Sequence, residues 1–509
     1  MDNILKYLEK TAERFPDKTA VDDGTVQFTY QELLDKARHF GLYFLDKTMP
    51  GRPVAILREK SSEVLAAMFG IVYAGCFYVM IDPEQPLERL KDILSVLKTD
   101  LVLTDSTYKN QLEDAGYQGE IYLLDQERTE ASLTEQDIEK LMERRSTADS
   151  ADLLYGIFTS GSTGKPKCVA VSQQAVIDFI GHFTKQFEIT DKDRIANQAP
   201  FDFDVSVKDI YSAITTGATL VLVPKRLFSL PPRLLDYLCD KKVTVMVWAV
   251  SALCLISSLK GLKYKIPEDA RIIMFSGEVM PVKQMRLWQQ ALPQTKFINL
   301  YGPSEITCNC TWYPVQREFQ DGEVIPAGKA FNGRTVFLLD DTGAEITEPG
   351  KTGEICVAGE SLADGYYHNE EETARRFVQG IIASTGETAR YYKTGDLGYY
   401  GEDENLYFAG RKDFQIKHMG HRIELGEVEA ACQALEGISR VCCIYDEPNT
   451  KIIAFYVGEL ESKAIIQGMG EKLPRFMIPN VFQKVDAMPL TKNGKIDRKA
   501  LMASYEERK

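Results

Sequence analysis

The sequence predicts an α/β protein: a large N-terminal domain of layered α/β subdomains, a β-rich subdomain after it, and a small α+β C-terminal domain. Short apolar runs alternate with amphipathic helical stretches over roughly the first 330 residues, which is typical of parallel sheets covered by helices. Over residues 336–410 the pattern shifts to short strands separated by Asp-Asp-Thr-Gly and Glu-Pro-Gly turns. A chain of 509 residues is also too long for one ordinary domain.

The apolar runs of the first part are expected to be strands, because strands buried on both faces carry short continuous apolar segments. These runs are Val54–Leu57, Leu101–Thr104, Thr219–Val223, Val243–Trp248 and Arg271–Phe275. Apolar residues recur at helical spacing in Ser61–Tyr73 and Val282–Ala291, and Met1–Leu8 opens an amphipathic helix rather than a signal peptide. The charged segment Asp125–Ala151 is expected to be a solvated helix and loop.

The stretch after Gly410 combines both patterns within about 100 residues, the size of a compact domain. Helices are expected at Glu427–Leu435 and Lys463–Lys472. Strands are expected at Val441–Tyr445 and Ile452–Val457. These elements predict a separate α+β unit at the end of the chain.

Composition and charge exclude several classes of protein. With 44% hydrophobic and 26% charged residues the chain is typical of soluble globular proteins, and its net charge of −14 argues against a nucleic-acid surface. No apolar run approaches the roughly 18 residues of a membrane span, so we expect no membrane insertion. The ten cysteines include no Cys-x-x-Cys pair and the five histidines show no ligand spacing, which disfavours a zinc site and predicts reduced thiols in a cytoplasmic protein.

One loop carries the clearest chemical signal. Residues 159–167 read Thr-Ser-Gly-Ser-Thr-Gly-Lys-Pro-Lys and directly follow the apolar run Leu153–Phe158. Glycines let the backbone curl so that several N–H groups point at one anion, while hydroxyl and lysine side chains add donors and positive charge. The loop therefore predicts a triphosphate cradle, with a solvated turn as the alternative. It is not a P-loop, because that motif requires glycine in place of Thr159 and serine or threonine in place of Pro166.

Ten further segments accompany this loop, in an order that resembles the adenylate-forming enzymes over nearly the whole chain. They are Phe28–Leu33, Ala74–Pro83, Phe203–Ser206, Asn299–Glu305, Gly353–Gly359, Tyr392–Leu397, Gly410–Lys417, His421–Glu427, Leu473–Pro479 and Asn493–Arg498. Together they look most like the amino-acid adenylation domains of nonribosomal peptide synthetases and the stand-alone D-alanine–carrier protein ligases. The resemblance implies that residues 1–412 form an adenylation core for ATP and the amino acid. It implies that residues 413–509 form a mobile domain that turns about a hinge at Asp413 and carries the catalytic lysine.

The resemblance also implies the reaction and its partners. ATP, with Mg²⁺, activates the carboxylate of an amino acid, and the aminoacyl group then passes to the phosphopantetheine thiol of a separate carrier protein. The chain leaves no room for a carrier domain, so we expect a free-standing ligase. Because this chain is itself acidic, docking of an acidic carrier protein predicts a local patch of lysine and arginine at the contact.

By resemblance, the loop holds the β- and γ-phosphates, Tyr301 stacks on adenine, Asp396 accepts both ribose hydroxyls, and Glu305 helps to hold Mg²⁺. The residues assigned to the nucleotide are Thr159, Ser160, Gly161, Ser162, Thr163, Gly164, Lys165, Lys167, Gly277, Glu278, Asn299, Tyr301, Gly302, Asp396 and Arg411. The structural alternatives are a core tyrosine, mobile solvated lysines, and a surface ion pair between the aspartate and the arginine.

Three residues are expected to take part in catalysis, namely Lys495, Lys417 and Glu305. Lys495 lies in an Asn-Gly-Lys segment near the C-terminus, where a solvated charge would be ordinary. In the family the matching lysine swings into the cleft and touches the acyl carboxylate and the α-phosphate, a task that suits a compact, flexible ammonium group. After the small domain rotates, Lys417 and Gly420 are expected to face the cleft, so that one cleft serves two half-reactions.

Asp204 matches the aspartate that binds the α-ammonium group in amino-acid-activating members of the family. Fatty acyl and aryl relatives usually lack it, because a buried unpaired charge is costly; its alternative role is the N-cap of the helix that follows. The residues that match the substrate pocket are Asp204, Val205, Lys208, Val247, Met274, Ser276, Leu300, Cys308 and Asn309. They predict a small or medium side chain with at most one polar group, such as serine, cysteine or alanine, and leave its chirality open.

Three residues depart from the family pattern. Cys168 stands where the family nearly always has glycine, and would be strained if this position needs a positive φ. Ser172 stands where many adenylation domains have histidine, although the D-alanine ligases also carry serine there. Lys208 places a positive charge near the pocket wall and either snorkels outward or selects an acidic side chain. None of the three removes a catalytic group.

The resulting hypothesis is an ATP-dependent amino-acid adenylating ligase that loads a carrier protein. The first alternative is a D-alanine–carrier protein ligase for teichoic-acid modification in the cell wall. The second is an acyl- or aryl-CoA synthetase, which Asp204 disfavours. The third is a non-catalytic binding protein, which the presence of Lys495, Asp396, Glu305 and Lys167 disfavours.

Overall fold

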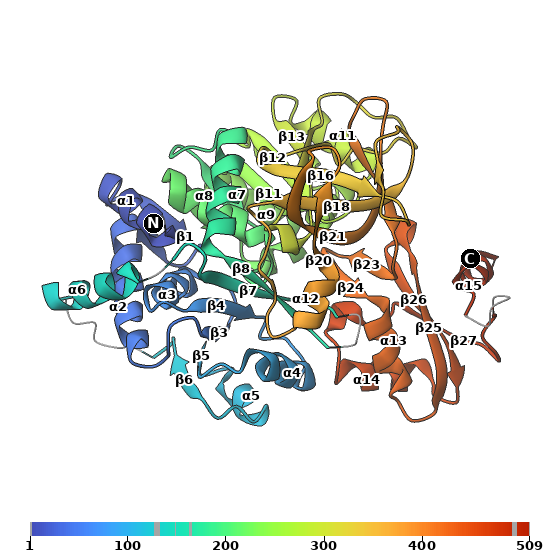
Figure 1. Ribbon diagram of the computed structural model, residues 1–509, viewed down its shortest axis with the longest axis horizontal. Coiled ribbons are helices and arrows are strands. Elements are labelled where there is room, and N and C mark those ends of the chain that lie inside the picture. The colour runs from blue at the N-terminus through green and yellow to red at the C-terminus, as the bar shows by residue number, and fades with distance from the viewer. Residues whose placement is uncertain (1–2, 127–132, 148, 162–164, 491–495, 508–509) are drawn as a thin grey trace.

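The first sheet of the protein has seven strands and lies in the first half of the chain. The computed structural model describes residues 3–126, 133–147, 149–161, 165–490 and 496–507 (Figure 1). The strand order is β19-β8-β7-β4-β3-β5-β6, with β7, β4, β3, β5 and β6 parallel and β8 and β19 antiparallel at one edge. The bounds are β3 (Pro53–Leu57), β4 (Phe77–Ile81), β5 (Leu101–Thr104), β6 (Glu120–Leu123), β7 (Leu153–Thr159), β8 (Lys167–Ser172) and β19 (Gly365–Tyr366).

A second sheet of nine strands lies beside it, in the order β15-β14-β13-β12-β11-β9-β10-β1-β2. Its centre is parallel, from β1 through β10, β9, β11 and β12 to β13, and its two edges are antiparallel. The bounds are β1 (Thr19–Asp22), β2 (Gln27–Thr29), β9 (Arg194–Asn197), β10 (Thr219–Leu222), β11 (Val245–Ala249), β12 (Ile272–Ser276), β13 (Lys296–Tyr301), β14 (Thr311–Pro314) and β15 (Lys329–Ala330).

Helices cover both faces of the two sheets (Figure 1). The inner layer, which packs against both sheets, consists of α1 (Ile4–Arg14), α2 (Tyr30–Leu45), α3 (Ser62–Tyr73), α7 (Gln173–Gln186) and α8 (Val205–Thr216), with α6 (Glu135–Ser146) against α2. The outer layers are α4 (Leu87–Leu97) and α5 (Lys109–Asp114) on one sheet, and α9 (Pro231–Asp240), α10 (Val250–Ser258) and α11 (Val282–Ala291) on the other. Alternation along each strand divides the core: Val247 and Met274 face the inner helices, whereas Trp248 and Phe275 face the outer ones.

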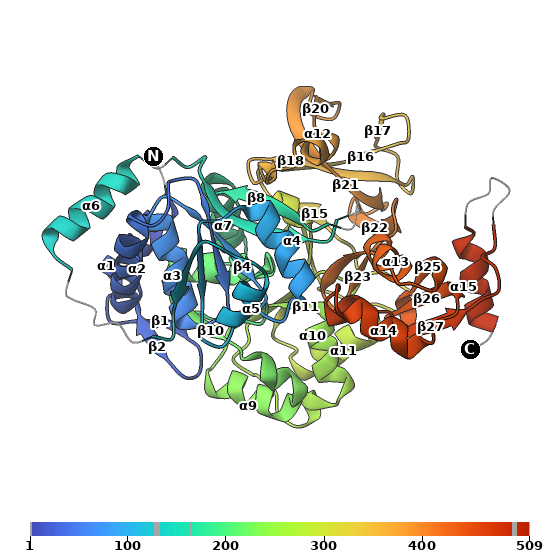
Figure 2. The same ribbon diagram turned by 90° about the horizontal axis from the view of Figure 1, so that it is seen from below.

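The β-rich subdomain follows as a sheet of six strands, which Figure 2 shows standing to one side of the layered part. It consists of β16 (Arg334–Leu339), β17 (Glu345–Ile346), β18 (Gly353–Gly359), β20 (Phe377–Ile382), β21 (Glu387–Tyr400) and β22 (Leu406–Arg411), with α12 (Glu370–Arg376) beside it. The strand β21 is long and pairs with β18, β20 and β22 in turn. Asp396 lies on β21 on the side of the layered part, and it is paired with Arg411 of the neighbouring strand β22.

The C-terminal part has its own apolar cores, made of residues from Ile423 onward. It opens with a hairpin and continues as a three-stranded sheet packed against helices (Figure 2). The bounds are β23 (Gln415–His418), β24 (His421–Glu424), α13 (Leu425–Gln433), β25 (Ile438–Asp446), β26 (Lys451–Gly458), α14 (Ser462–Gly470), β27 (Val481–Lys484) and α15 (Arg498–Glu507). A large N-terminal and a smaller C-terminal domain of mixed α/β structure are therefore confirmed.

The strands and helices expected from periodicity are present, with shifted ends. For example, β25 begins at Ile438 rather than Val441, because a bulge at Ile438–Arg440 extends its pairing with β26 through polar residues that carry no apolar signal. Within the described part of the chain, no helix combines the length and apolar character needed to span a membrane. All ten cysteines are free thiols, and most of them are buried.

The backbone at Cys168 is not strained, because this position does not require a positive φ. It lies in the extended strand β8 and does not belong to the residues with positive φ. Its side chain packs in the core between β7 and β4, where Gly156 leaves the space: a Cβ on Gly156 would come within 2.6 Å of the Cys168 sulfur and 3.1 Å of Val79. The cysteine therefore fills a position in the apolar core.

Candidate active site

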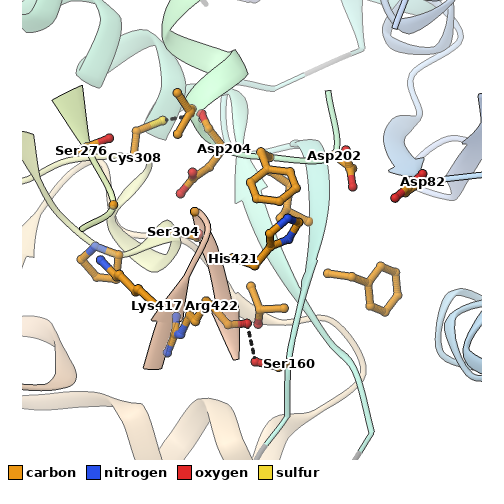
Figure 3. A pocket seen from close by; sticks show the side chains of 18 of the residues that line it. Asp82, Ser160, Asp202, Asp204, Ser276, Ser304, Cys308, Lys417, His421 and Arg422 are labelled. Carbon is orange, nitrogen blue, oxygen red and sulfur yellow. Dashed lines mark hydrogen bonds between the residues drawn. The ribbon is translucent and has the colours of Figure 1, made fainter. Parts of the chain in front are cut away.

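A cavity of about 160 Å³ lies between the layered part, the β-rich subdomain and the C-terminal domain (Figure 3). It sits at the carboxyl ends of β9, β12 and β13, where ligands of open parallel sheets usually bind. The sequence-predicted residues that line it are Thr159, Ser160, Asp204, Val205, Lys208, Ser276, Gly277, Gly302, Cys308, Asn309, Asp396, Arg411 and Lys417. Segments more than 200 residues apart in the sequence thus meet around one space.

Asp204 stands at the N-cap position of α8, but its side chain makes no capping hydrogen bond. The carboxylate points into the cavity instead, toward the side on which Lys417 lies (Figure 3). Cys308 anchors this segment from the other side, because its thiol lies 3.1 Å from the backbone carbonyl oxygen of Asp204. The structure therefore favours the pocket role of Asp204 over the capping role.

The predicted pocket residues divide into a lining set and a supporting set. Lys208, Ser276 and Asn309 line the cavity. Val247, Met274 and Leu300 do not; they are buried behind it among the inner helices. The side-chain pocket is therefore closed from behind by apolar residues, and its lining combines Val205 with the polar side chains of Lys208, Ser276 and Asn309.

The residues assigned to adenine and ribose form one hydrogen-bonded group. The Tyr301 hydroxyl donates to Asp396 Oδ2 over 2.6 Å, and Arg411 donates to the other carboxylate oxygen of Asp396. Gly302 allows close approach of the chain at Asn309, since a Cβ on it would lie 2.5 Å from Asn309 Cα. Asn299 differs from the expectation, because its amide donates 2.8 Å to the Pro326 carbonyl and stays outside the cavity lining.

Part of the phosphate loop is described, while Ser162, Thr163 and Gly164 lie outside the described residues. Thr159 Oγ1 is buried without a hydrogen-bond partner among the residues described, and Gly161 must be glycine, because a Cβ there would meet the Lys165 carbonyl oxygen. An unpartnered hydroxyl beside a glycine cradle fits a phosphate ligand.

The two lysines of this loop differ. Lys165 is exposed, as a mobile side chain would be. Lys167 is 6% exposed and its ammonium group lies 3.3 Å from Glu372 and 5.0 Å from the centre of the Tyr366 ring. Burial lowers the pKa of Lys167, and Arg422 lowers it further, against the attraction of Glu305 and Glu372.

Glu305 is fully buried and its charge is already compensated. Arg422 Nη1 donates to both carboxylate oxygens, over 2.9 and 2.8 Å, and the Tyr366 hydroxyl donates to Oε1 over 2.6 Å. Burial would raise the pKa of Glu305, but Arg422 and Tyr366 outweigh it and hold the pKa at about 2. In this arrangement the carboxylate does not fit Mg²⁺, because the guanidinium group occupies the position of the cation. Among the described residues no other cluster of acidic, histidine or cysteine side chains could hold a metal.

Several hydrogen bonds fix the C-terminal domain against the phosphate loop. Ser160 Oγ donates 2.8 Å to the Arg422 carbonyl and accepts 3.1 Å from the Glu424 N–H (Figure 3). Glu427 accepts 3.3 Å from the Gly161 N–H and pairs with Arg89, which is also largely buried. The domain thus occupies donors of the same loop that is predicted to hold phosphates.

The hairpin β23–β24 places its tip in the cavity. Gly420, at φ +83°, donates its N–H 2.8 Å to Glu278, so Glu278 meets the C-terminal domain rather than forming a free wall for adenine. The Lys417 ammonium group lies 5.9 Å from the centre of the Tyr301 ring. Burial lowers the pKa of Lys417, against the attraction of Asp396. Lys417 and Gly420 thus both lie at the cavity, whereas the rotation of the domain stays a prediction.

Asp413 joins the two parts of the protein. Arg411 binds it through two hydrogen bonds of 2.7 and 3.0 Å, and Arg376 lies 3.5 Å from it. The same Arg411 therefore connects the predicted hinge to Asp396 in the cavity. Lys495, the predicted catalytic lysine, lies outside the described residues.

Sequence reasoning did not single out Arg422, His421 or Glu427, although all three lie in a quoted motif. Arg422 and Glu427 each form an ion pair with the N-terminal domain, and His421 stacks on Phe476 at a ring distance of 3.5 Å while meeting the edge of Phe203 at 4.8 Å. For Arg422 the available signal was alternation, because Ile423 is the buried apolar residue of β24 and the residue before it must face the other way. The residues that Arg422, His421 and Glu427 contact are determined by the tertiary structure and cannot be inferred from this local pattern.

Comparison with known proteins agrees with this geometry. The family described as AMP-binding enzyme matches residues 8–367, and its AMP-binding enzyme C-terminal domain matches residues 427–495. The chain belongs to the AMP-binding enzyme family.

The relatives of this AMP-binding enzyme include two large synthases. It is 34% identical over 98% of its length to bacitracin synthase 1 of Bacillus licheniformis, covering 9% of that protein. It is 32% identical over 98% of its length to tyrocidine synthase 1 of Brevibacillus parabrevis, covering 45% of it. The chain therefore spans less than half the length of these relatives.

A solved structure extends the likeness to three dimensions. It is that of holo-PA1221, an NRPS protein containing adenylation and PCP domains bound to a vinylsulfonamide inhibitor. The two chains are 25% identical with a TM-score of 0.84, and the match covers 99% of this chain and 84% of the other. The expected membership among adenylate-forming ligases of the peptide-synthetase type is confirmed, whereas the special likeness to D-alanine ligases stays a prediction.

Proposed function

We propose that this chain activates an amino acid as its aminoacyl-adenylate and passes it to the phosphopantetheine thiol of a separate carrier protein. The observation that carries the proposal is the orientation of Asp204, whose carboxylate faces the cavity although its backbone stands at a helix N-cap. Among the described residues it forms no ion pair. A carboxylate in a cavity without a partner calls for a cationic ligand. The α-ammonium group of an amino acid supplies one, whereas fatty and aryl acids do not.

The residues around the cavity suit the first half-reaction. We assign the ribose to Asp396 and Arg411, and the phosphates to Thr159, Gly161 and the loop lysines. Joining a carboxylate to the α-phosphorus of ATP brings two anions together, so the work of the protein is charge neutralisation and alignment. We assign the bridging positive charge to Lys495. Mg²⁺ receives no role at Glu305 while Arg422 is bound there.

We assign the domain arrangement described above to the second half-reaction. The C-terminal domain occupies Ser160 and Gly161 of the phosphate loop, which is compatible with a cleft that pyrophosphate has left. Lys417 and Gly420 then face the cavity, where the thiol of a carrier protein would arrive. Rotation of residues 413–509 about Asp413 is the proposed route between the two arrangements.

The test is amino-acid-dependent exchange of pyrophosphate into ATP, screened over L- and D-amino acids. One amino acid is expected to support exchange, and Asp204→Ala is expected to lower its kcat/KM by about 100-fold, the loss of one charged hydrogen bond in a closed site. Asp240→Ala is the matched control, because Asp240 is 76% exposed. Lys495→Ala is expected to abolish exchange with an unchanged unfolding temperature.

The outcomes separate the alternatives. A response to D-alanine alone would move the chain to the D-alanine–carrier protein ligases, and a response to an L-amino acid would support the peptide-synthetase type. Exchange with fatty or aryl acids but not with amino acids would replace the proposal by a CoA synthetase. Silence over all acids, or full activity of Asp204→Ala, would overturn it.

A further inference from the structure

A buried lysine stands in the side-chain part of the cavity. Lys208 is 1% exposed and lies on α8, one turn after Asp204. Its ammonium group carries three N–H donors, and one of them donates 2.6 Å to Asn309 Oδ1, a neutral acceptor. Among the residues that the structure describes, Lys208 forms no ion pair. The lysine side chain does not extend outward to solvent. Its charge and its two remaining N–H donors are therefore available to a ligand in the cavity.

Within the described part of the chain, neither nearby carboxyl group forms an ion pair with Lys208. Asp204 and Lys208 have the spacing at which aspartate and lysine usually pair on a helix, yet no ion pair forms between them. Asp209, the next residue on the helix, is fully buried and accepts 2.9 Å from the amide of Asn197. Burial raises the pKa of Asp209 to about 7 and outweighs the positive charges of Lys208 and Lys60, which favour its ionised form, so its carboxyl group compensates Lys208 only in part. A buried ammonium group without a counter-charge is costly, which makes an anionic ligand the natural partner.

The partner of Lys208 is held by an unusual stretch of backbone. Thr307 and Cys308 both have positive φ, of 52° and 76°, which β-branched and bulky residues rarely adopt. The Thr307 hydroxyl secures the turn by donating 2.7 Å to the Ser361 carbonyl. This turn leads directly to Asn309, which is 2% exposed. Strained backbone of this kind persists where the surrounding structure fixes a functional group.

We propose that Lys208 binds the side-chain carboxylate of the substrate, so that this chain selects an acidic amino acid of the aspartate or glutamate class. The inference rests on the proposed amino-acid activation and narrows its substrate. One helical turn, about 6 Å, separates the residues that would receive the α-ammonium group and the side-chain carboxylate. Asn309, which contacts Lys208, and Ser276 add neutral hydrogen-bonding groups to the lining of the same cavity, and apolar Val247, Met274 and Leu300 are buried behind that lining.

The proposal changes the expected substrate. Serine, cysteine or alanine would leave the ammonium group of Lys208 buried beside a neutral side chain. An amide side chain would accept a hydrogen bond but would not compensate the charge. Only an anionic side chain both accepts the hydrogen bond and compensates the charge of Lys208.

The test compares each acid with its amide in pyrophosphate exchange by the full chain: aspartate with asparagine and glutamate with glutamine, in both chiralities, with alanine and serine as references. One acid is expected to exceed its amide in kcat/KM by about 100-fold or more, because a site built for one polar group rejects its near-isostere. Lys208→Met is expected to lower kcat/KM for that acid by at least about 100-fold and to abolish or reverse the preference over the amide. Lys192→Met, at an exposed lysine, is the control and should change neither value.

A second variant guards against a folding defect. Asn309→Asp keeps the lysine and places a carboxylate against it, which should also remove the preference for the acid. Lys208→Met should unfold at a temperature no lower than the parent, because it removes an uncompensated charge.

The results distinguish failure of the Lys208 assignment from failure of the proposed amino-acid activation. Preference of the parent for a neutral amino acid, or an unchanged acid preference in both variants, would overturn the assignment of Lys208 while leaving amino-acid activation intact. Absence of exchange with every amino acid would overturn both.

Discussion

Arg422→Met should separate the two half-reactions proposed above for this enzyme. The arginine is on the C-terminal domain, and its partner Glu305 is fully buried in the N-terminal domain. Methionine keeps the length and apolar stem of the side chain but removes the guanidinium group. In the docked arrangement, Glu305 would then be a buried carboxylate without its guanidinium partner, left with the Tyr366 hydroxyl and the weaker support of Lys167 and Tyr392.

The size of the effect follows from the burial of the pair. Removing one partner of a buried ion pair costs about 3–5 kcal/mol, because the other charge stays desolvated. Here the cost falls on the docked arrangement alone, since the C-terminal domain can move away and let the carboxylate meet water or a cation. At about 1.4 kcal/mol per factor of ten, the equilibrium constant for docking falls at least about 100-fold.

The assay measures each half-reaction separately. Adenylate formation is followed by pyrophosphate exchange, and transfer is followed by mass spectrometry of the thioester formed with pantetheine in a single turnover. Transfer by Arg422→Met should be at least about 100-fold slower, with exchange unchanged or faster. Amide hydrogen exchange should increase in β24 and around Gly161, which form the contact. Arg440→Met, at an exposed arginine of the same domain, should leave all three unchanged.

Two results would refute the reasoning. Equal losses in exchange and transfer would mean that Arg422 acts during adenylate formation rather than in docking. Unchanged transfer and unchanged hydrogen exchange would mean that the ion pair does not hold the domain.

Three further predictions concern stability. Burial lowers the pKa of His421 from 6.5 to about 4, so domain docking should be strongest above pH 6.5 and weaken as the pH falls to 4, and His421→Phe should lose this dependence in hydrogen exchange. Lys60→Met should lower the free energy of unfolding in urea by about 2 kcal/mol, because Lys60 donates to three backbone carbonyls after β9. Cys168→Gly should lower it by about 2 kcal/mol through a cavity beside Gly156, rather than relieve strain.

Each of these has its own check. A pH dependence retained in His421→Phe would assign it to another group. A stable Lys60→Met would mean that water replaces the lysine at the carbonyls. A more stable Cys168→Gly would show that the family's glycine is preferred at this position for backbone reasons.

Much of the fold was predictable because its signals are local. Val54–Leu57 and Leu101–Thr104 are continuous apolar runs since their strands are covered on both faces, and the observed strands coincide with them almost residue for residue. Because Asp204 is a carboxylate in a family motif, the sequence reduced its role to two alternatives, binding of the α-ammonium group or the N-cap of a helix. By contrast, the partner of Glu305 could not be predicted, because Arg422 is 117 residues away and a metal ion would satisfy the same carboxylate equally well.

The sequence by itself determined the family, the layered α/β architecture and the set of residues that carry the chemistry, since motif order and hydrophobic period are written along the chain. Only the tertiary structure decided what each charge faces. It placed Arg422 on Glu305, Ser160 against Glu424, and the ammonium group of Lys208 at the cavity, bound to the neutral side chain of Asn309. Pairing of charges depends on distance and burial between segments hundreds of residues apart, and no local pattern encodes that.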